Sequence, residues 1–124
     1  MIAADTSSIV AYIDGDQGED TKNLDALMES RQVALPPPVL AELLSEPHLP
    51  PNIKEALLNL VLLEITSGYW ERAGHLRAKI LAKGLKARLA DTLIAQSCLD
   101  HDIPLITRDP DFRHFKPLGL KLLP

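Results

Sequence analysis

The sequence contains one cysteine, few aromatic residues and no long apolar run. Cys98 alone cannot form an internal disulfide or a zinc finger, and a single thiol of this kind suits a reducing compartment. Apolar residues make up 46% of the chain, but no stretch reaches the length of a membrane span. The first residues also lack the basic, apolar and small-residue regions of a signal peptide. We therefore expect a cytoplasmic protein without membrane contact.

Size and charge narrow the possible partners. The 124 residues have room for one domain, which we expect to span residues 1–124. The chain has 13 Lys and Arg against 17 Asp and Glu, so a basic face alone cannot hold nucleic acid. Aromatic residues make up only 4%, and no platform for stacking RNA bases is visible. A phosphate-bearing partner would need another source of positive charge.

Short apolar runs alternate with segments of helical periodicity along the whole chain. The expected strands are Met1–Ala4, Val33–Leu35, Leu62–Ile65, Pro104–Thr107 and, as a fifth, Leu120–Leu123. The expected helices cover about residues 6–15, 16–30, 39–45, 52–60, 69–84 and 90–101. This alternation predicts an α/β fold of three layers, with a mainly parallel central sheet of four to five strands and helices on both faces.

Three of the expected helices differ in how much of their surface should be buried. Segment 16–30 is mostly polar and predicts a solvent-exposed helix. In segment 69–84 the apolar residues recur at helical spacing, which predicts one buried face; they are Tyr69, Ala73, Leu76 and Ile80. Cys98 lies among apolar residues of the last expected helix, which favours core packing over a role as nucleophile.

Four acidic residues occupy positions where ligands bind in α/β proteins. Asp5 and Asp109 follow expected strands, while Glu42 and Asp91 lie near the starts of expected helices. Ligands of parallel sheets bind beyond the carboxyl ends of the strands. Each acid also has a purely local explanation: Asp5 can cap a helix, Asp109 before Pro110 can form a turn, Asp91 suits a helix dipole, and Glu42 falls on a solvated face. Both explanations remain open at this point.

The order of these motifs resembles a known family. The motifs are a strand followed by Asp5-Thr6-Ser7, then Pro38-Val39-Leu40-Ala41-Glu42-Leu43, then Ala90-Asp91-Thr92-Leu93-Ile94-Ala95, then Leu105-Ile106-Thr107-Arg108-Asp109-Pro110-Asp111-Phe112. This pattern resembles a PIN-domain ribonuclease and, more narrowly, the VapC-like toxins of type II toxin-antitoxin systems. The resemblance covers essentially the whole chain and implies a single PIN-like nuclease domain over residues 1–124.

The resemblance implies a metal-dependent endoribonuclease that hydrolyses phosphodiester bonds to a 5'-phosphate and a 3'-hydroxyl. It assigns catalysis and metal binding to Asp5, Glu42, Asp91 and Asp109, with Mg²⁺ or Mn²⁺ as the cofactor. Physical chemistry supports the choice of ion, because neighbouring carboxylates repel one another and hard oxygen ligands suit these cations. Two divalent ions would balance the four negative charges.

Other residues near the four acids are expected to support them. Hydroxyl groups that could orient a carboxylate or a bound water belong to Thr6, Ser7 and Thr107. Side chains that could contact RNA phosphates belong to Lys86, Arg88 and Arg108, with Lys83 and Arg113 close by in the sequence.

The family resemblance also implies protein partners. One is a cognate antitoxin whose C-terminal segment would cover the acidic groove. The other is a second copy of the chain, because family members are commonly homodimers. Apolar residues that could contribute either to such surfaces or to the core are Val10, Ile13, Leu57, Leu58 and Val61.

Two alternatives belong to other functional classes. A PIN-like module could bind RNA or protein without cleaving, although the acidic pattern is complete here. A phosphoacceptor receiver domain also combines an α/β sheet with an acidic Mg²⁺ pocket, and Lys116-Pro117 matches one of its features. A receiver needs an acceptor Asp at the end of a central strand, whereas Leu62–Ile65, which we expect to be the central strand here, offers only Glu64.

Overall fold

The computed structural model describes all 124 residues and contains one five-stranded sheet. The strands are β1 (Ile2–Ala4), β2 (Val33–Leu35), β3 (Val61–Leu62), β4 (Leu105–Ile106) and β5 (Leu122–Leu123). Their order across the sheet is β3-β2-β1-β4-β5, and every neighbouring pair is parallel. The predicted parallel sheet and its fifth strand are therefore confirmed.

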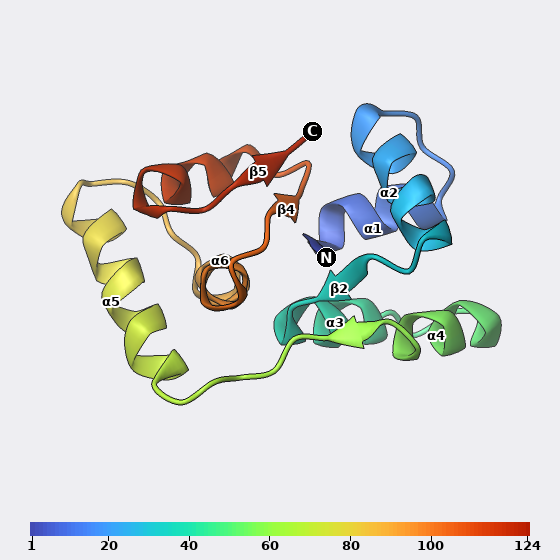
Figure 1. Ribbon diagram of the computed structural model, residues 1–124, viewed down its shortest axis with the longest axis horizontal. Helices are drawn as coiled ribbons and strands as arrows, with labels where there is room; N and C mark the ends of the chain where they lie inside the picture. Colours follow the sequence, from blue (N-terminus) through green and yellow to red (C-terminus); the bar gives the residue numbers. More distant parts are fainter.

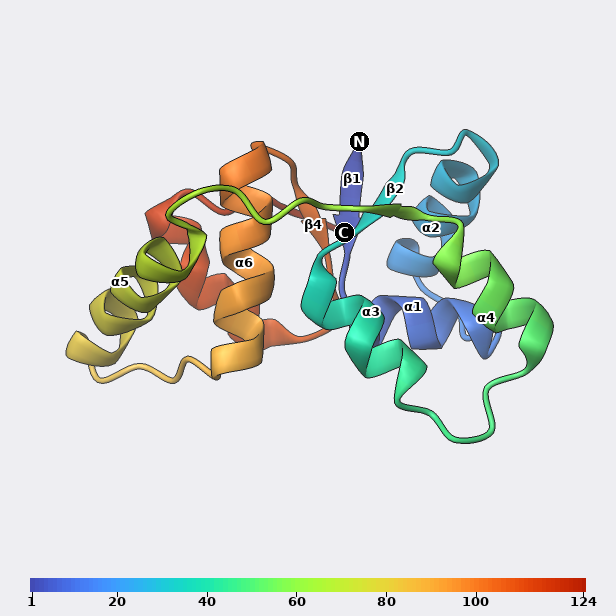
Figure 2. The same cartoon turned by 90° about the horizontal axis from the view of Figure 1, so that it is seen from below.

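Helices cover both faces of the sheet. They are α1 (Thr6–Ile13), α2 (Glu19–Glu29), α3 (Pro37–Leu44), α4 (Pro51–Leu58), α5 (Tyr69–Ala82), α6 (Leu89–His101) and the 3₁₀ helix η1 (Pro110–Leu118). Figures 1 and 2 show α1 and α2 on one side of the strands and α5 and α6 on the other, which gives the three layers of the predicted α/β fold. None of these helices combines the length and the apolar character needed to cross a bilayer.

The core lies where the central strands meet these helices. Every residue of β2 and β4 is buried, as expected for parallel strands covered on both faces. The predicted apolar face of α5 is confirmed, because Tyr69, Ala73, Leu76 and Ile80 are its buried residues. Cys98 belongs to the core cluster and is fully buried, which also confirms its predicted packing role.

Two of the sequence predictions were wrong in detail. The third strand comprises Val61–Leu62 instead of Leu62–Ile65, and it forms an exposed edge of the sheet rather than its centre. Its apolar side chains face solvent, so their pattern gave no reliable boundary. Helix α2 begins at Glu19 and is not exposed throughout, because Asp20, Thr21 and Leu24 are buried.

The pairing of β1 with β4 positions the ends of both strands. Ala4 lies opposite Ile106, so the next residues along the chain, Asp5 and Thr107, leave the sheet side by side. The Asp5 amide donates to the carbonyl of Ile106 at 3.0 Å. Figure 2 shows the first turns of α1, α3 and α6 at this same end of the sheet. The fold thus brings four chain segments to one place.

Candidate active site

Asp5 stands at the end of β1 and is also the residue that caps α1. It is buried, with 4% of its surface exposed. One carboxylate oxygen accepts from the Ser7 amide at 2.6 Å, and the other accepts from the hydroxyls of Ser7 and Thr107. Burial raises the pKa of Asp5 despite these hydrogen bonds, which lower it, and the charge of Asp109 raises it further. The capping role and the site position therefore coexist.

The turn after β4 is hydrogen-bonded to the start of α1. The Thr107 hydroxyl, which donates to Asp5, accepts from the Asp109 amide at 3.0 Å. The Arg108 amide donates to the hydroxyl of Ser7 at 3.0 Å. Asp109 in turn caps η1, because its carboxylate accepts from the Asp111 amide at 2.9 Å. Ser7 and Thr107 thus contact the Asp5 carboxylate directly, whereas Asp109 is held in the turn by the hydrogen bond from its backbone amide to Thr107.

Asp91 lies in the first turn of α6 and has no such partners. Its Oδ2 is the one buried side-chain oxygen or nitrogen in the structure without a hydrogen bond. Burial and the negative charges of Asp109 and Asp5 raise the pKa of Asp91 to about 6, with a smaller contribution from Glu42, while Arg88 opposes the shift. The four predicted acids therefore share one electrostatic environment. We call Asp5, Glu42, Asp91 and Asp109 the acidic cluster.

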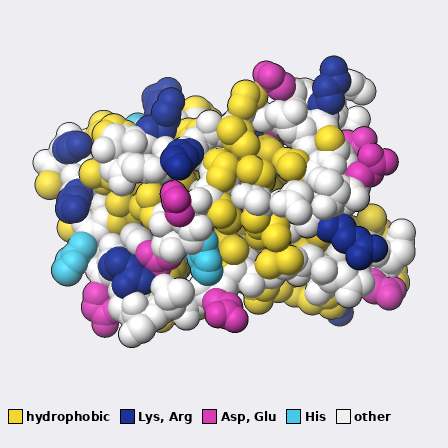
Figure 3. All heavy atoms as spheres, in the orientation of Figure 1, with side chains coloured by type: hydrophobic (Ala, Val, Ile, Leu, Met, Phe, Trp, Pro, Cys, Tyr) yellow, Lys and Arg dark blue, Asp and Glu magenta, His cyan; other side chains and the backbone are white.

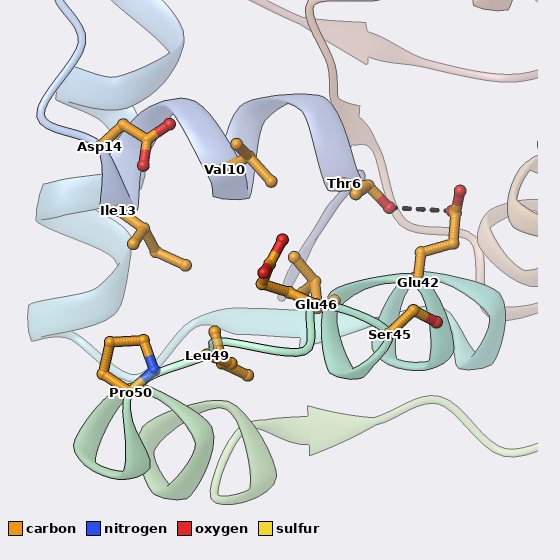
Figure 4. Close-up of a pocket in the computed structure, with 10 residues that line it drawn as sticks. Thr6, Val10, Ile13, Asp14, Glu42, Ser45, Glu46, Leu49 and Pro50 are labelled. Carbon is orange, nitrogen blue, oxygen red and sulfur yellow. Dashed lines mark hydrogen bonds between the residues drawn. The ribbon is translucent and has the colours of Figure 1, made fainter.

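Glu42 completes this cluster from α3. Its side chain is exposed, as the helical periodicity predicted, but it is not free. The Thr6 hydroxyl donates to Glu42 Oε1 at 2.9 Å, as Figure 4 shows. Because Thr6 directly follows Asp5, this bond ties α3 to the carboxyl end of β1. All three hydroxyl residues named by the sequence thus contact an acid of the cluster.

The donor atoms of the cluster suit a divalent cation. Carboxylate oxygens are hard ligands, and the unpartnered Oδ2 of Asp91 leaves one of them free to coordinate. No three Asp, Glu, His or Cys side chains lie close enough to hold a single ion together. Mg²⁺ commonly binds proteins through one or two carboxylates and fills its remaining positions with water or phosphate oxygens. The arrangement fits that mode and not a preformed cage of three or more acids.

The basic residues near the acidic cluster differ in whether they already have an acidic partner. Arg88 precedes α6, is exposed, and lies near enough to Asp91 to lower its pKa. Lys86 is exposed in the same loop. The guanidinium of Arg108 is instead paired with Asp20, with Nε 2.6 Å from Oδ2 and Nη2 3.0 Å from Oδ1. Contacts of these residues with RNA stay predictions, and for Arg108 they compete with an intramolecular partner.

Comparison with known proteins adds a family to this geometry. The PIN domain family matches residues 2–117. The chain belongs to the PIN domain family. The family resemblance seen in the sequence is therefore confirmed, and a receiver domain is excluded. No protein with a curated description matches the chain at a significant level.

Solved structures share the fold of this PIN domain over its whole length. VapBC2 from Rickettsia felis, bound to a DNA fragment from its promoter, is 24% identical, covers 99% of this chain and 98% of the other, and has a TM-score of 0.74. FitAcB from Neisseria gonorrhoeae is 20% identical, with coverage of 100% and 97% and a TM-score of 0.72. VapBC-5 from Mycobacterium tuberculosis, of the VapBC toxin-antitoxin family, is 21% identical, with coverage of 98% and 94% and a TM-score of 0.65.

A cavity of about 500 Å³ opens beside the acidic cluster of this PIN domain. Thr6 and Glu42 form one end of it, and the cavity extends between α1 and the loop after α3 (Figure 4). Its lining combines apolar and acidic side chains, namely Val10, Ile13, Leu43, Leu49 and Pro50 with Asp14, Glu42 and Glu46. We call this cavity the α1–α3 groove.

Asp20 is the important residue that sequence reasoning missed. It is 6% exposed, and its carboxylate accepts from Ser8 Oγ at 2.9 Å as well as from Arg108. One signal in the sequence could have placed it inside: Asp20 stands four residues before Leu24, which is fully buried. Its partner Arg108 is 88 residues away, and no local pattern identifies such a pair.

Proposed function

We propose that this PIN domain is a metal-dependent endoribonuclease and the toxin of a type II toxin-antitoxin pair. The observation that carries the proposal is Asp91, whose buried Oδ2 has no hydrogen-bond partner and whose pKa is raised by burial and by its acidic neighbours. An ionised carboxylate without a partner destabilises a fold unless a cation compensates it. Membership of the PIN domain family supports the assignment of such a site to a nuclease.

Under this proposal Asp91 and Asp5 hold Mg²⁺ or Mn²⁺ directly, and Asp109 and Glu42 complete the site directly or through water. The bound ion would lower the pKa of a coordinated water and offset negative charge on the scissile phosphate. The hydroxyls of Ser7 and Thr107 keep the Asp5 carboxylate in one orientation by donating to the same oxygen.

RNA enters the proposal through the basic residues beside the cluster. The chain carries a net charge of -4, so a polyanion must bind at a local positive region. Arg88 and Lys86 supply that region at the start of α6, next to Asp91. Phosphate contacts of this kind position the substrate but do not read its sequence.

The cleavage test compares two chemically identical substitutions at opposite ends of α6. Asp91→Asn removes the charge of an oxygen that makes no hydrogen bond, while Asp102→Asn alters a side chain that is 90% exposed, at a left-handed position that asparagine tolerates. A pool of tRNA, rRNA and mRNA is incubated with each protein and Mg²⁺, Mn²⁺ or EDTA. We expect metal-dependent cleavage that falls about 100-fold or more in Asp91→Asn and persists in Asp102→Asn.

Two outcomes would overturn the nuclease proposal. Equal cleavage by the wild type and Asp91→Asn would show that the activity comes from another protein or another site. Absence of cleavage with either metal, in a protein that still binds RNA or a partner, would identify the chain as an inert PIN-like module.

The α1–α3 groove supports the antitoxin part of the proposal. Its apolar lining and three carboxylates suit a partner segment that carries both apolar and basic side chains. A segment seated there would also cover Glu42 and so reach the acidic cluster. The similar structures include toxin-antitoxin complexes from several bacteria.

Size-exclusion chromatography tests this partner with the product of the adjacent gene, produced together with the chain. Val10→Lys places a cation among apolar side chains of the groove, and Val10 is 42% exposed, so the fold tolerates the change. Leu81→Lys on α5, 46% exposed in the wild type, is the matched control. We expect Val10→Lys alone to weaken the complex. A complex that survives both substitutions would contradict binding in the groove.

A homodimer is also part of the proposal. Figure 3 shows apolar side chains gathered in the middle of one face, with most charged side chains around them. Of the apolar residues named from the sequence, Val10, Ile13, Leu58 and Val61 are exposed, whereas Leu57 is buried in the core. Sedimentation equilibrium of the wild type and of Val61→Lys tests the dimer. A monomeric wild type at micromolar concentration would contradict it.

A further inference from the structure

The Asp20–Arg108 pair lies outside the acidic cluster but is connected to it. The Arg108 guanidinium binds both carboxylate oxygens of Asp20, and its Nη2 also donates to the carbonyl of Gln17 at 2.7 Å. Ser8 of α1 donates to the same carboxylate. The side chain of Arg108 thus fixes the turn after β4 against the first turn of α2 and the loop that precedes it.

The backbone of Arg108 is fixed on its other side. Its amide donates to Ser7 Oγ, and its two neighbours in sequence are site residues. Thr107 donates to Asp5, and the Asp109 amide donates to Thr107. Any rotation of this turn would therefore shift the hydroxyl on Asp5 and the carboxylate of Asp109 together. The Asp20–Arg108 contact opposes such a rotation.

Gly18 gives independent support, because its backbone lies against the pair. A Cβ at this position would stand 2.5 Å from Asp20 Oδ1 and 2.6 Å from Arg108 Nη2. Both distances are far below an ordinary van der Waals contact, so a side chain at residue 18 would displace the carboxylate of Asp20 or the guanidinium of Arg108. The substitution Gly18→Ala would disturb the pair without removing a charge.

We propose that Arg108 is a positioning residue: its pair with Asp20 holds Thr107 and Asp109 in the place that the acidic cluster requires. The inference rests on the proposed nuclease function and concerns the same site. A bidentate arginine–carboxylate contact fixes the relative orientation of the two side chains as well as their distance, which a single lysine ammonium cannot do. Arg108 therefore serves the turn and not an RNA phosphate.

The two roles of Arg108 predict different kinetics. A phosphate contact contributes to substrate binding and its loss raises KM, with a shallower dependence of binding on salt, by about 0.7 to 1 in logarithmic slope. A positioning contact affects the chemical step, so its loss lowers kcat and leaves KM and the salt slope unchanged. In addition, only positioning requires Asp20, because Asp20→Asn would leave Arg108 free to bind phosphate.

The experiment measures RNA cleavage for Arg108→Met, Asp20→Asn and the double variant, with Arg88→Met as a reference for a phosphate contact. We expect each single change to lower kcat about 10- to 100-fold and the double variant to be no worse than either. Arg108→Lys should restore little, and Gly18→Ala should resemble Asp20→Asn. Arg88→Met should instead raise KM and reduce the salt slope.

Amide hydrogen exchange supplies a readout that does not depend on cleavage. In Asp20→Asn the amides of Arg108 and Asp109 should exchange about tenfold faster, while those of α5 keep the wild-type rate. A raised KM in Arg108→Met with normal kcat in Asp20→Asn would overturn the proposal in favour of phosphate binding. Unchanged exchange in the turn would also overturn it. If the wild type does not cleave RNA, the proposed nuclease function is wrong. The exchange rates of the turn amides still show whether the Asp20–Arg108 pair holds the turn in place.

Discussion

Asp20 and Asp91 both lie in the first turn of a helix, yet their carboxylates are in opposite electrostatic states. The hydrogen bonds from Arg108 hold the pKa of Asp20 below its ordinary value. Burial and acidic neighbours raise the pKa of Asp91 to about 6. A helix N-terminus favours negative charge in both cases, so the dipole does not account for the difference. The difference comes from their partners: the carboxylate of Asp20 is hydrogen-bonded inside the protein, whereas the Oδ2 of Asp91 has no partner.

Among the tests of this difference between Asp20 and Asp91, addition of Mg²⁺ should change the stability of the protein most. A ligand that binds only the folded state, at 100 times its dissociation constant, stabilises it by about 2.7 kcal/mol. We expect Mg²⁺ to raise the Tm of the wild type and of Asp102→Asn, and to have little effect on Asp91→Asn. Differential scanning calorimetry in Mg²⁺ and in EDTA measures this. An equal rise in all three proteins would place the ion elsewhere.

Replacement of Asp20 should have the next largest effect. Asp20→Asn removes a charge from the pair, but the Arg108 side chain is 35% exposed, so water screens part of the interaction. We expect a loss of about 1 to 1.5 kcal/mol at pH 7 in urea unfolding. Because the pKa of Asp20 is lowered in the folded state, the loss should begin to shrink as the pH falls below about 4, the pKa of the unfolded chain, and should vanish only once the pH is below the lowered pKa of the folded protein. A loss that stays the same from pH 7 to acid pH, without shrinking below about pH 4, would mean a packing defect.

Replacement of Asp91 should have the smallest effect and the opposite sign. In EDTA at pH 7, Asp91→Asn should stabilise the protein by about 1 kcal/mol, after allowance for solvent screening. Since the pKa of Asp91 is raised to about 6 in the folded state, the wild type loses stability as the pH rises from about 4 to 6. The advantage of the variant should therefore disappear below about pH 4. Destabilisation at pH 7 would contradict the unpartnered state of Asp91.

The sequence predicted the α/β sheet well because its central strands are short, apolar and bounded by turn residues. It placed the third strand wrongly because β3 lies at an exposed edge, where apolar side chains have no period that reports burial. The four acids were recognised from their order along the chain, since each alone had an equally good local explanation. For Asp5 the local explanation is also true, because it caps α1, whereas Asp109, which was expected to form a turn, caps the 3₁₀ helix η1.

Other properties of the site depend on contacts that no local pattern contains. The periodicity of α3 correctly made Glu42 exposed but could not show its bond to Thr6. Arg108 was predicted to contact RNA from its charge and position alone, whereas its guanidinium meets Asp20 across 88 residues. Metal binding by the acidic cluster stays a prediction that the experiments above decide.

The central position of β1 has a consequence for the order in which the acidic cluster is assembled. Strand β1 is synthesised long before β4, with which it pairs, and the Asp5 carboxylate accepts a hydrogen bond from the Thr107 hydroxyl, 102 residues later. Contacts of such separation form late in folding, because a long loop must close before they are gained. A nascent chain shorter than about residue 110 therefore has neither a complete sheet nor a complete set of acids. In the nuclease proposed above, this order would delay activity towards ribosomal RNA until the segment that carries Thr107 and Asp109 has been synthesised.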